Sequence, residues 1–277
     1  MHRFYFAPEN WNPDHLVLAG GEAHHARDVL RLKPGATAVL FNGCGREIKA
    51  ELVDTSPNEL RFRKLTETET PPLRCRITLG QAIPKGKNMD LIVQKAVEIG
   101  VAEIYPLMSQ RTVVDLDPDT AAQKQAKWQQ IAIEAAKQCG QNWLPEIRPP
   151  QTLKDFFSPS SVAAVYSSRR SDTKADDRRT NSTAKEPSGA VHFDLQLIGS
   201  LQPDAQHLKK ILAEYSGSHG DRPKTVLMLV GPEGDFTPAE LSLAKRHSCL
   251  PITLGPIILR VETAAIYCLS ILSYELF

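Results

Sequence analysis

The sequence lacks the features that would give the protein disulfides, a metal site or a membrane segment. Its five cysteines are odd in number and form no Cys-x-x-Cys pair, which argues against a disulfide framework or a zinc site. No run approaches about 18 consecutive apolar residues, and the N-terminus has no basic stretch leading into an apolar segment of signal-peptide length. We expect a soluble, cytoplasmic protein with reduced thiols, no metal and no membrane partner.

The chain also lacks an excess of charge of either sign. It carries 33 Lys and Arg against 32 Asp and Glu, a net charge of +1. Any binding of nucleic acid must therefore come from a local patch rather than from bulk charge. The length of 277 residues is sufficient for two domains and a sizeable core.

A glycine-bearing loop at 231–235 (Gly-Pro-Glu-Gly-Asp) is the first of two that point to a function. It follows an apolar run at 226–230, which is typical of a buried strand in a parallel sheet. Just beyond it, Thr237 and Glu240 form the pattern of a capping box, which predicts a helix start. No G-x-x-x-x-G-K-[ST] motif occurs and no G-x-G-x-x-G follows the first strand, so P-loop and dinucleotide sites lose their main support.

A second loop at 254–260 (Leu-Gly-Pro-Ile-Ile-Leu-Arg) repeats this arrangement. A strand-like segment at 250–254 precedes it, and a helix from Val261 to about Glu275 follows. Ligands of open α/β sheets bind at the carboxyl ends of the strands, where glycines let the backbone come close. Two such ends predict one shared pocket for a small molecule.

The charges of these loops bear on the ligand. Glu233 and Asp235 would repel phosphate and favour a positively charged ligand, for which the sulfonium of S-adenosylmethionine is suitable. Both loops are also compatible with ordinary strand-to-helix turns. The charged pair Arg260 and Glu262, placed immediately before an almost wholly apolar helix, favours the pocket.

Residues up to about Thr70 are predicted to form a small β-rich unit. Apolar segments flank the turn that begins at Asn42, which predicts a hairpin, and a helix is expected at about 22–32. The adjacent prolines at 71 and 72 mark a boundary because they cannot continue a strand ladder. The histidine pair at 24 and 25 has no third ligand at a recognised metal spacing.

From Arg74 onwards, strands alternate with helices, as in a parallel sheet. A long helix is expected from Asp117 to about Gln138, with Lys124, Lys127 and Lys137 on solvent. After a strand at 162–166, the segment 167–190 has no hydrophobe larger than alanine. It cannot bury a core, and we expect a mobile insertion there.

Several motifs resemble the ribosomal RNA small subunit methyltransferase E family, which methylates N3 of a uridine in 16S rRNA. The two glycine loops with their helix starts, GPEGDFTPAE and LGPIILRVETAA, are similar to the C-terminal signatures of that family. The resemblance also covers QKAVEIGV at 94–101, Ser109-Gln110-Arg111, and the EAAKQ segment at 134–138. Nearly the whole chain is included.

The resemblance implies a fold and partners. It predicts a C-terminal α/β domain of the SPOUT class with a trefoil knot (73–277) and an N-terminal PUA-like β-barrel that binds RNA (1–72). It also implies a homodimer that acts on 16S rRNA or the small ribosomal subunit. The helix after Val261 is apolar over most of its circumference, as a helix buried against a core and a partner would be.

The resemblance also assigns residues to the site. Those expected to bind S-adenosylmethionine are Leu229, Gly231, Glu233, Gly234, Leu254, Gly255, Ile258, Leu259 and Thr263. Those expected to contact RNA are His25, Arg27, Arg31, Lys33 and Arg111, although a solvated helix face would explain the first four equally well.

Uracil N3 carries a proton, so its methylation requires a base and a group that stabilises the anion. Arg260 cannot be the base because its guanidinium stays protonated, but it can stabilise the charge on the uracil oxygens. Glu262 or Glu233 is then the candidate base, and Glu262 could equally serve to hold Arg260 in place. A related enzyme acting on another RNA, and a catalytically silent RNA-binding relative, stay open as alternatives.

The sequence departs from the family pattern at Asp235, where a second glycine is frequent. It also departs at Ile257 and Gln141, where arginine is frequent. Arg260, Glu262 and Thr263 are retained, so the departures bear on RNA contact more than on the activity.

Overall fold

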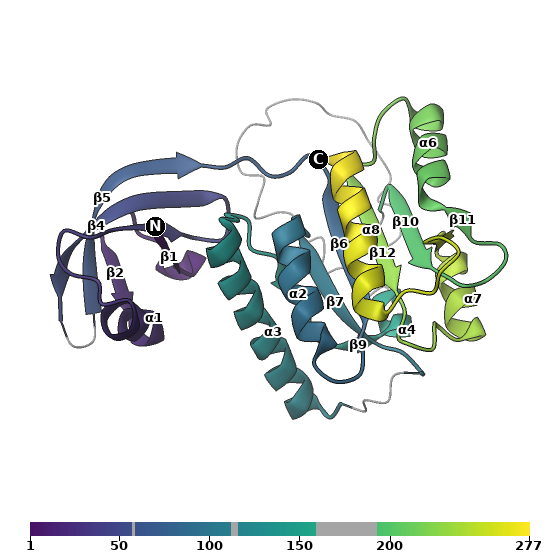
Figure 1. Cartoon of the computed structure of the whole chain (residues 1–277), viewed down its shortest axis with the longest axis horizontal. Helices are drawn as coiled ribbons and strands as arrows, with labels where there is room; N and C mark the ends of the chain where they lie inside the picture. Colours follow the sequence, from purple (N-terminus) through teal and green to yellow (C-terminus); the bar gives the residue numbers. More distant parts are fainter. Residues whose placement is uncertain (57–58, 112–115, 159–192) are drawn as a thin grey trace, which may run out of the picture.

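The computed structural model describes residues 1–56, 59–111, 116–158 and 193–277. Figure 1 shows a curled N-terminal sheet beside a larger sheet covered by helices. The predicted strand at 162–166 and the predicted insertion at 167–190 lie outside the described residues. In the described ranges, no helix is both long and apolar enough to span a bilayer.

The N-terminal sheet has the strand order β1-β3-β4-β5-β2. Strands β1 and β3 are parallel, and the other neighbours are antiparallel. The strands are β1 (His2–Tyr5), β2 (Leu16–Ala19), β3 (Thr37–Phe41), β4 (Arg46–Thr55) and β5 (Glu59–Glu69). The predicted hairpin joins β3 to β4, and its turn is held by the Asn42 side chain, which accepts hydrogen bonds from the backbone N–H groups of Cys44 at 2.8 Å and Arg46 at 3.1 Å.

A separate hydrophobic core lies inside this curled sheet. Phe4, Leu40, Ile48 and Leu60 are fully buried in it, because alternate residues of each strand point to the same face. The predicted helix at 22–32 forms as α1 (Gly20–His24) followed by a π-helical turn (His25–Val29), and a short 3-10 helix lies at Pro8–Asn10.

The C-terminal sheet is parallel throughout, which confirms the predicted α/β class. Its strand order is β11-β13-β10-β12-β6-β7-β8, and β9 also pairs with β7. The strands are β6 (Arg76–Ala82), β7 (Glu103–Met108), β8 (Glu146–Ile147), β9 (Gln151–Thr152), β10 (Leu195–Gly199), β11 (Gln206–His207), β12 (Thr225–Val230) and β13 (Leu250–Thr253). The trefoil knot that the resemblance implies stays a prediction.

Two hydrophobic cores lie on the two faces of this sheet, and strand β12 contributes to both. Met228 and Val230 belong to the core with α2 (Asn88–Ile99), α3 (Pro118–Cys139), α6 (Leu208–His219) and α8 (Val261–Leu276). Leu227 and Leu229 belong to the core with α4 (Leu153–Phe156) and α7 (Pro238–Arg246). A strand buried on both faces explains the continuous apolar run at 226–230.

Helix α8 buries its apolar residues mainly in the chain's own core. Ala265, Cys268, Leu269 and Leu272 are each fully buried there. The side of the helix that remains open carries Tyr274, which is 87% exposed. The apolar character of α8 is therefore explained largely within one chain.

The expectation that Lys137 lies on solvent is wrong. Its side chain is 9% exposed, and its ammonium pairs with Glu22 of α1 at 2.9 Å and with Glu134 at 3.0 Å. The Trp143 indole N–H, just after α3, donates to the carbonyl oxygen of Thr70 at 2.9 Å. These contacts join the end of α3 to the N-terminal sheet.

Candidate active site

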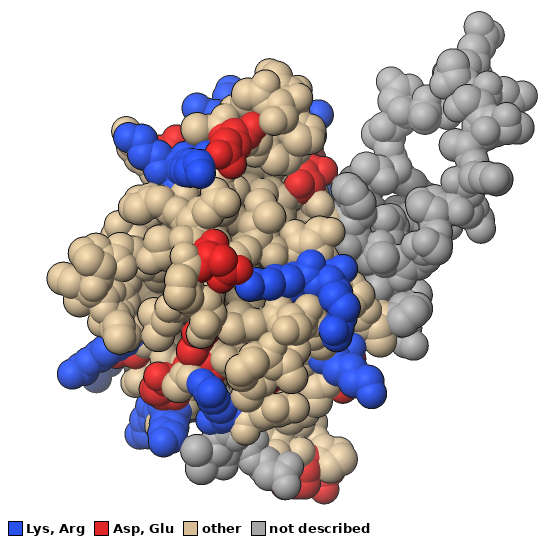
Figure 2. All heavy atoms as spheres, turned by 90° about the vertical axis from the view of Figure 1, so that its right-hand side faces the viewer, with Lys and Arg blue, Asp and Glu red and all other residues tan. Residues whose placement is uncertain are grey.

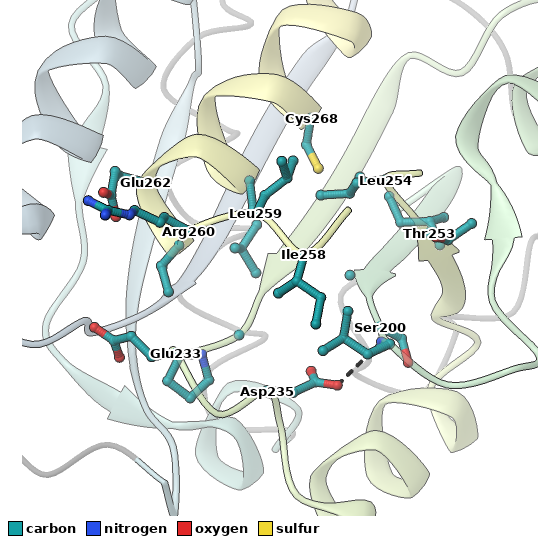
Figure 3. A pocket seen from close by; sticks show the side chains of 18 of the residues that line it. Ser200, Glu233, Asp235, Thr253, Leu254, Ile258, Leu259, Arg260, Glu262 and Cys268 are labelled. Atoms are coloured by element: carbon teal, nitrogen blue, oxygen red, sulfur yellow. Dashed lines mark hydrogen bonds between the residues drawn. The ribbon is translucent and has the colours of Figure 1, made fainter. Parts of the chain in front are cut away.

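A cavity of about 450 Å³ lies at the carboxyl ends of β10, β12 and β13. This volume is within the usual range of small-molecule pockets, roughly 300 to 1,000 Å³. Figure 3 shows that its wall is made by the segments that follow these strands and by the start of α8. The sheet order places β10 between β12 and β13, so the two glycine loops face each other across the end of the intervening strand.

The loop at 231–235 is held in place by the start of α7 and by the segment that follows β7. The predicted capping box of α7 is present, with the Thr237 hydroxyl accepting from the Glu240 N–H at 3.3 Å. The buried Glu240 carboxylate also accepts from the Ser109 hydroxyl at 3.1 Å and from the Gln110 N–H at 3.0 Å. The Arg111 guanidinium donates to the carbonyl oxygen of Gly234. The Ser-Gln-Arg segment after β7 therefore supports the first glycine loop.

Two glycines of the cavity wall have a physical reason to be glycine. Gly255 has a φ of +116°, a conformation that other residues rarely adopt. At Gly231, a Cβ would lie 3.2 Å from both the ring and the backbone nitrogen of Phe236. Both glycines are also part of the cavity wall.

Three charged groups lie at one end of the cavity. Arg260, Glu262 and Glu233 all line the cavity, and Figure 3 shows them on the same side of it. The Glu233 carboxylate accepts from the Lys85 N–H at 2.9 Å, and the Glu262 carboxylate accepts from the Asn88 side-chain amide at 3.3 Å. Each candidate base is thus held by the segment that leads from β6 into α2.

Asp235 lines the cavity where the loop after β12 meets the loop after β10. It adopts a left-handed conformation with a φ of +62°, which Asp tolerates better than most residues. Its carboxylate accepts from the Phe236 N–H at 2.7 Å and from the Leu201 N–H at 3.3 Å. The side chain therefore connects the loop after β12 to the loop after β10, in a position where glycine could make no such contact.

The Cys268 thiol lies in the cavity wall and is fully buried. Burial raises its pKa to about 12, so the thiol stays protonated near neutral pH. A protonated thiol is a poor nucleophile, and Cys268 therefore contributes packing to the cavity.

Most of the predicted cofactor-binding residues line the cavity. These are Gly231, Glu233, Leu254, Gly255, Ile258 and Leu259, and the predicted catalytic residues Arg260 and Glu262 join them. Among the described residues, Leu229, Gly234 and Thr263 do not contribute to the wall. Leu229 packs in the core on the opposite face of the sheet, and Thr263 is exposed on α8.

Sequence reasoning missed the third segment of the wall, which consists of Gly199, the last residue of β10, and the following Ser200 and Leu201. A weaker signal was present, because the segment 195–198 (Leu-Gln-Leu-Ile) is followed by a glycine, as the apolar run at 226–230 is. Asn88 at the start of α2 was also missed.

The predicted RNA-binding residues fall into two places. Arg27 forms a bidentate pair with Asp28 at 2.7 and 2.8 Å, and this hydrogen bonding lowers the pKa of Asp28. Arg31 and Lys33 are exposed beside it, whereas His25 is half-buried. Arg111 lies apart from them, at the first glycine loop of the cavity.

Two protein-family models match the chain. A model of the RNA methyltransferase domain matches residues 71–273, and a model of the RNA methyltransferase PUA domain matches residues 18–65. The chain is therefore an RNA methyltransferase by family.

Similar sequences define the family more closely. The chain is 27% identical to the ribosomal RNA small subunit methyltransferase E of Bacillus subtilis over 93% of its own length and 89% of that protein. It is 30% identical to the Mesomycoplasma hyopneumoniae protein of the same name over 70% of its own length and 68% of that protein. It belongs to the ribosomal RNA small subunit methyltransferase E family.

Solved structures give the same result. The Neisseria gonorrhoeae ribosomal RNA small subunit methyltransferase E, bound to S-adenosyl methionine, is 28% identical with a TM-score of 0.74, covering 99% of this chain and 98% of that one. A putative methyltransferase from Legionella pneumophila, in complex with the bound cofactor SAM, is 31% identical with a TM-score of 0.77, covering 99% and 97% of the two chains.

Proposed function

We propose that this protein transfers a methyl group from S-adenosylmethionine to N3 of a specific uridine in 16S rRNA. The observation that carries the proposal is the cavity at the strand ends, with Arg260, Glu262 and Glu233 gathered at one end of it. The relatives named for small subunit rRNA methylation, and the two similar structures that contain the cofactor, support the same activity.

The cavity suits the proposed cofactor in size and charge. Backbone groups of Gly231, Leu254 and Gly255 would bind the adenosine, because these loops bring main-chain N–H and C=O groups to the cavity surface. The carboxylates of Glu233 and Asp235 would favour the positive sulfonium. When bound, S-adenosylmethionine supplies the methyl group on an electrophilic carbon.

The side chains at the charged end would activate the uracil. A carboxylate of Glu262 or Glu233 would accept the N3 proton, directly or through water, while the Arg260 guanidinium stabilises the charge that develops on the uracil oxygens. Loss of this proton would leave N3 with a localised lone pair, which is the nucleophile that methyl transfer requires. Within the described residues, the Glu262 and Glu233 carboxylates each accept one hydrogen bond, which leaves acceptor capacity on both.

The N-terminal and C-terminal parts of the chain would have different roles. We propose that residues 1–72 hold the RNA through the surface around α1, and that residues 73–277 carry the cofactor and the chemistry. N3 lies on the Watson–Crick edge, so the target uridine must be unpaired or splayed from its stack. A homodimer through the open side of α8, around Tyr274, and a cytoplasmic location belong to the same proposal.

Titration calorimetry with S-adenosylmethionine, followed by transfer of a labelled methyl group, tests the function. We expect saturable cofactor binding and labelling of 16S rRNA, either free or in small subunits. Absence of cofactor binding would indicate a silent RNA-binding relative. Labelling of tRNA without labelling of 16S rRNA would assign the protein to another substrate.

A further inference from the structure

The segment between β6 and α2 carries two lysines at the edge of the cavity. Lys85, Gly86 and Lys87 are all exposed. The backbone N–H of Lys85 donates to Glu233 at 2.9 Å, and Asn88, just after the segment, donates to Glu262 at 3.3 Å. The Lys85 backbone and the Asn88 side chain therefore attach this segment to the two candidate bases, and neither contact uses a lysine ammonium group.

Both ammonium groups lack an acidic partner among the described residues, since no carboxylate lies within 4.0 Å of either. Lysines nearby behave differently: Lys95 pairs with Glu98 at 2.8 Å, and Lys127 pairs with Asp90 at 2.5 Å. Leaving two cations unpaired at a cavity mouth favours an anionic partner from solution.

Acidic side chains outnumber basic ones in the cavity wall. Glu233, Asp235 and Glu262 line the cavity together with Arg260, so the interior disfavours a phosphate group. Lys85 and Lys87 lie on the exposed segment outside, and Arg111 is exposed beside the Gly234 carbonyl. By contrast, Figure 2 shows basic and acidic side chains interspersed over the face that contains α6 and α7.

We infer that Lys85 and Lys87 form a phosphate-binding rim, which holds the RNA strand at the cavity mouth while one base enters. The inference rests on the proposed function and deepens it, because it assigns RNA contacts to the catalytic part of the chain in addition to the N-terminal sheet. Phosphate contacts fix the position of the strand without reading its sequence. The rim would set the position of the target uridine relative to Glu233 and Glu262, to which the same segment is hydrogen-bonded.

The experiment measures the salt dependence of binding to a single-stranded 16S rRNA fragment for wild type and for the double variant Lys85→Ala/Lys87→Ala. Alanine removes the ammonium groups but keeps the backbone N–H that binds Glu233. Each lost phosphate contact should reduce the slope of log K against log salt by about 0.7. The loss of affinity should then be about seven-fold larger at ~50 mM than at ~200 mM salt.

The matched control is Arg74→Ala/Lys224→Ala. It removes two exposed cations that precede β6 and β12, at the amino-terminal ends of the strands and therefore at the end of the sheet opposite the cavity. Its slope should stay close to that of wild type. Cofactor affinity, measured by calorimetry, should be unchanged in both double variants, which also reports that they are folded. An unchanged slope for the Lys85/Lys87 variant, or an equal fall in the control, would overturn the rim. Failure of the wild type to bind or methylate rRNA would overturn the proposed function as well.

Discussion

A methyl group added at Gly255 should damage the cofactor pocket without a steric clash. The φ of Gly255 is +116°, and a Cβ built on it meets nothing within 4 Å. The cost of Gly255→Ala is therefore backbone strain alone, on the order of 1–3 kcal/mol for a residue outside its allowed conformations. The loop can relieve this strain by moving, which shifts the backbone groups that line the cavity.

The strain energy at Gly255 gives an expected change in the affinity for S-adenosylmethionine. If the loop must return to its original conformation to bind S-adenosylmethionine, 1–3 kcal/mol corresponds to a Kd increased by about 5- to 150-fold. Titration calorimetry measures this change, and thermal unfolding reports whether the domain remains folded.

Gly220→Ala is the matched control for this prediction. Gly220 ends α6 with a φ of +69°, and a Cβ there also meets nothing within 4 Å. It lies outside the cavity wall, so the variant should lose some stability and keep its cofactor affinity. Wild-type affinity in Gly255→Ala, or an equal loss in Gly220→Ala, would refute the role of this loop.

Four further predictions concern other parts of the chain. Arg260→Lys keeps the charge but loses the planar fork, so single-turnover methyl transfer should slow by about ten- to a thousand-fold with cofactor affinity unchanged; a normal rate would show that Arg260 has another role. Ala265→Glu should lower the free energy of unfolding by several kcal/mol and unfold the protein, because Ala265 is fully buried in the chain's own core. Tyr274→Glu should instead give folded monomers in sedimentation if α8 forms the dimer interface. A thiol reagent near pH 8 should modify the exposed Cys44 and Cys139 in the native protein, since burial raises the pKa of the other three thiols to about 12 and keeps them protonated; rapid reaction of all five would contradict this burial.

Local patterns predicted much of the fold. The capping box at Thr237, the hairpin turn at Asn42 and the continuous apolar run at 226–230 each have a short-range physical cause, so the sequence alone revealed them. The glycine loops predicted the cavity for the same reason, because their place at strand ends follows from the alternation of strand and helix.

The features that the sequence did not predict depend on contacts between residues far apart in the chain. Lys137 looked like a solvated helix residue, but its partner Glu22 comes from a distant part of the chain. Leu229 lies next to the glycine loop in sequence, yet the two-residue period of a strand turns it to the opposite face from Met228. The contribution of Gly199 depended on β10 lying between β12 and β13, an order that crossover connections set and local patterns do not reveal.

Mass spectrometry of nucleosides from 16S rRNA detects the proposed modification itself. The rRNA is taken from a strain that lacks this protein, and from the same strain supplied with the wild-type chain or with Arg260→Lys. We expect N3-methyluridine to be absent from the deletion strain, to return with the wild-type protein and to be reduced with the variant. N3-methyluridine in 16S rRNA at the same level in all three strains would contradict the proposed function.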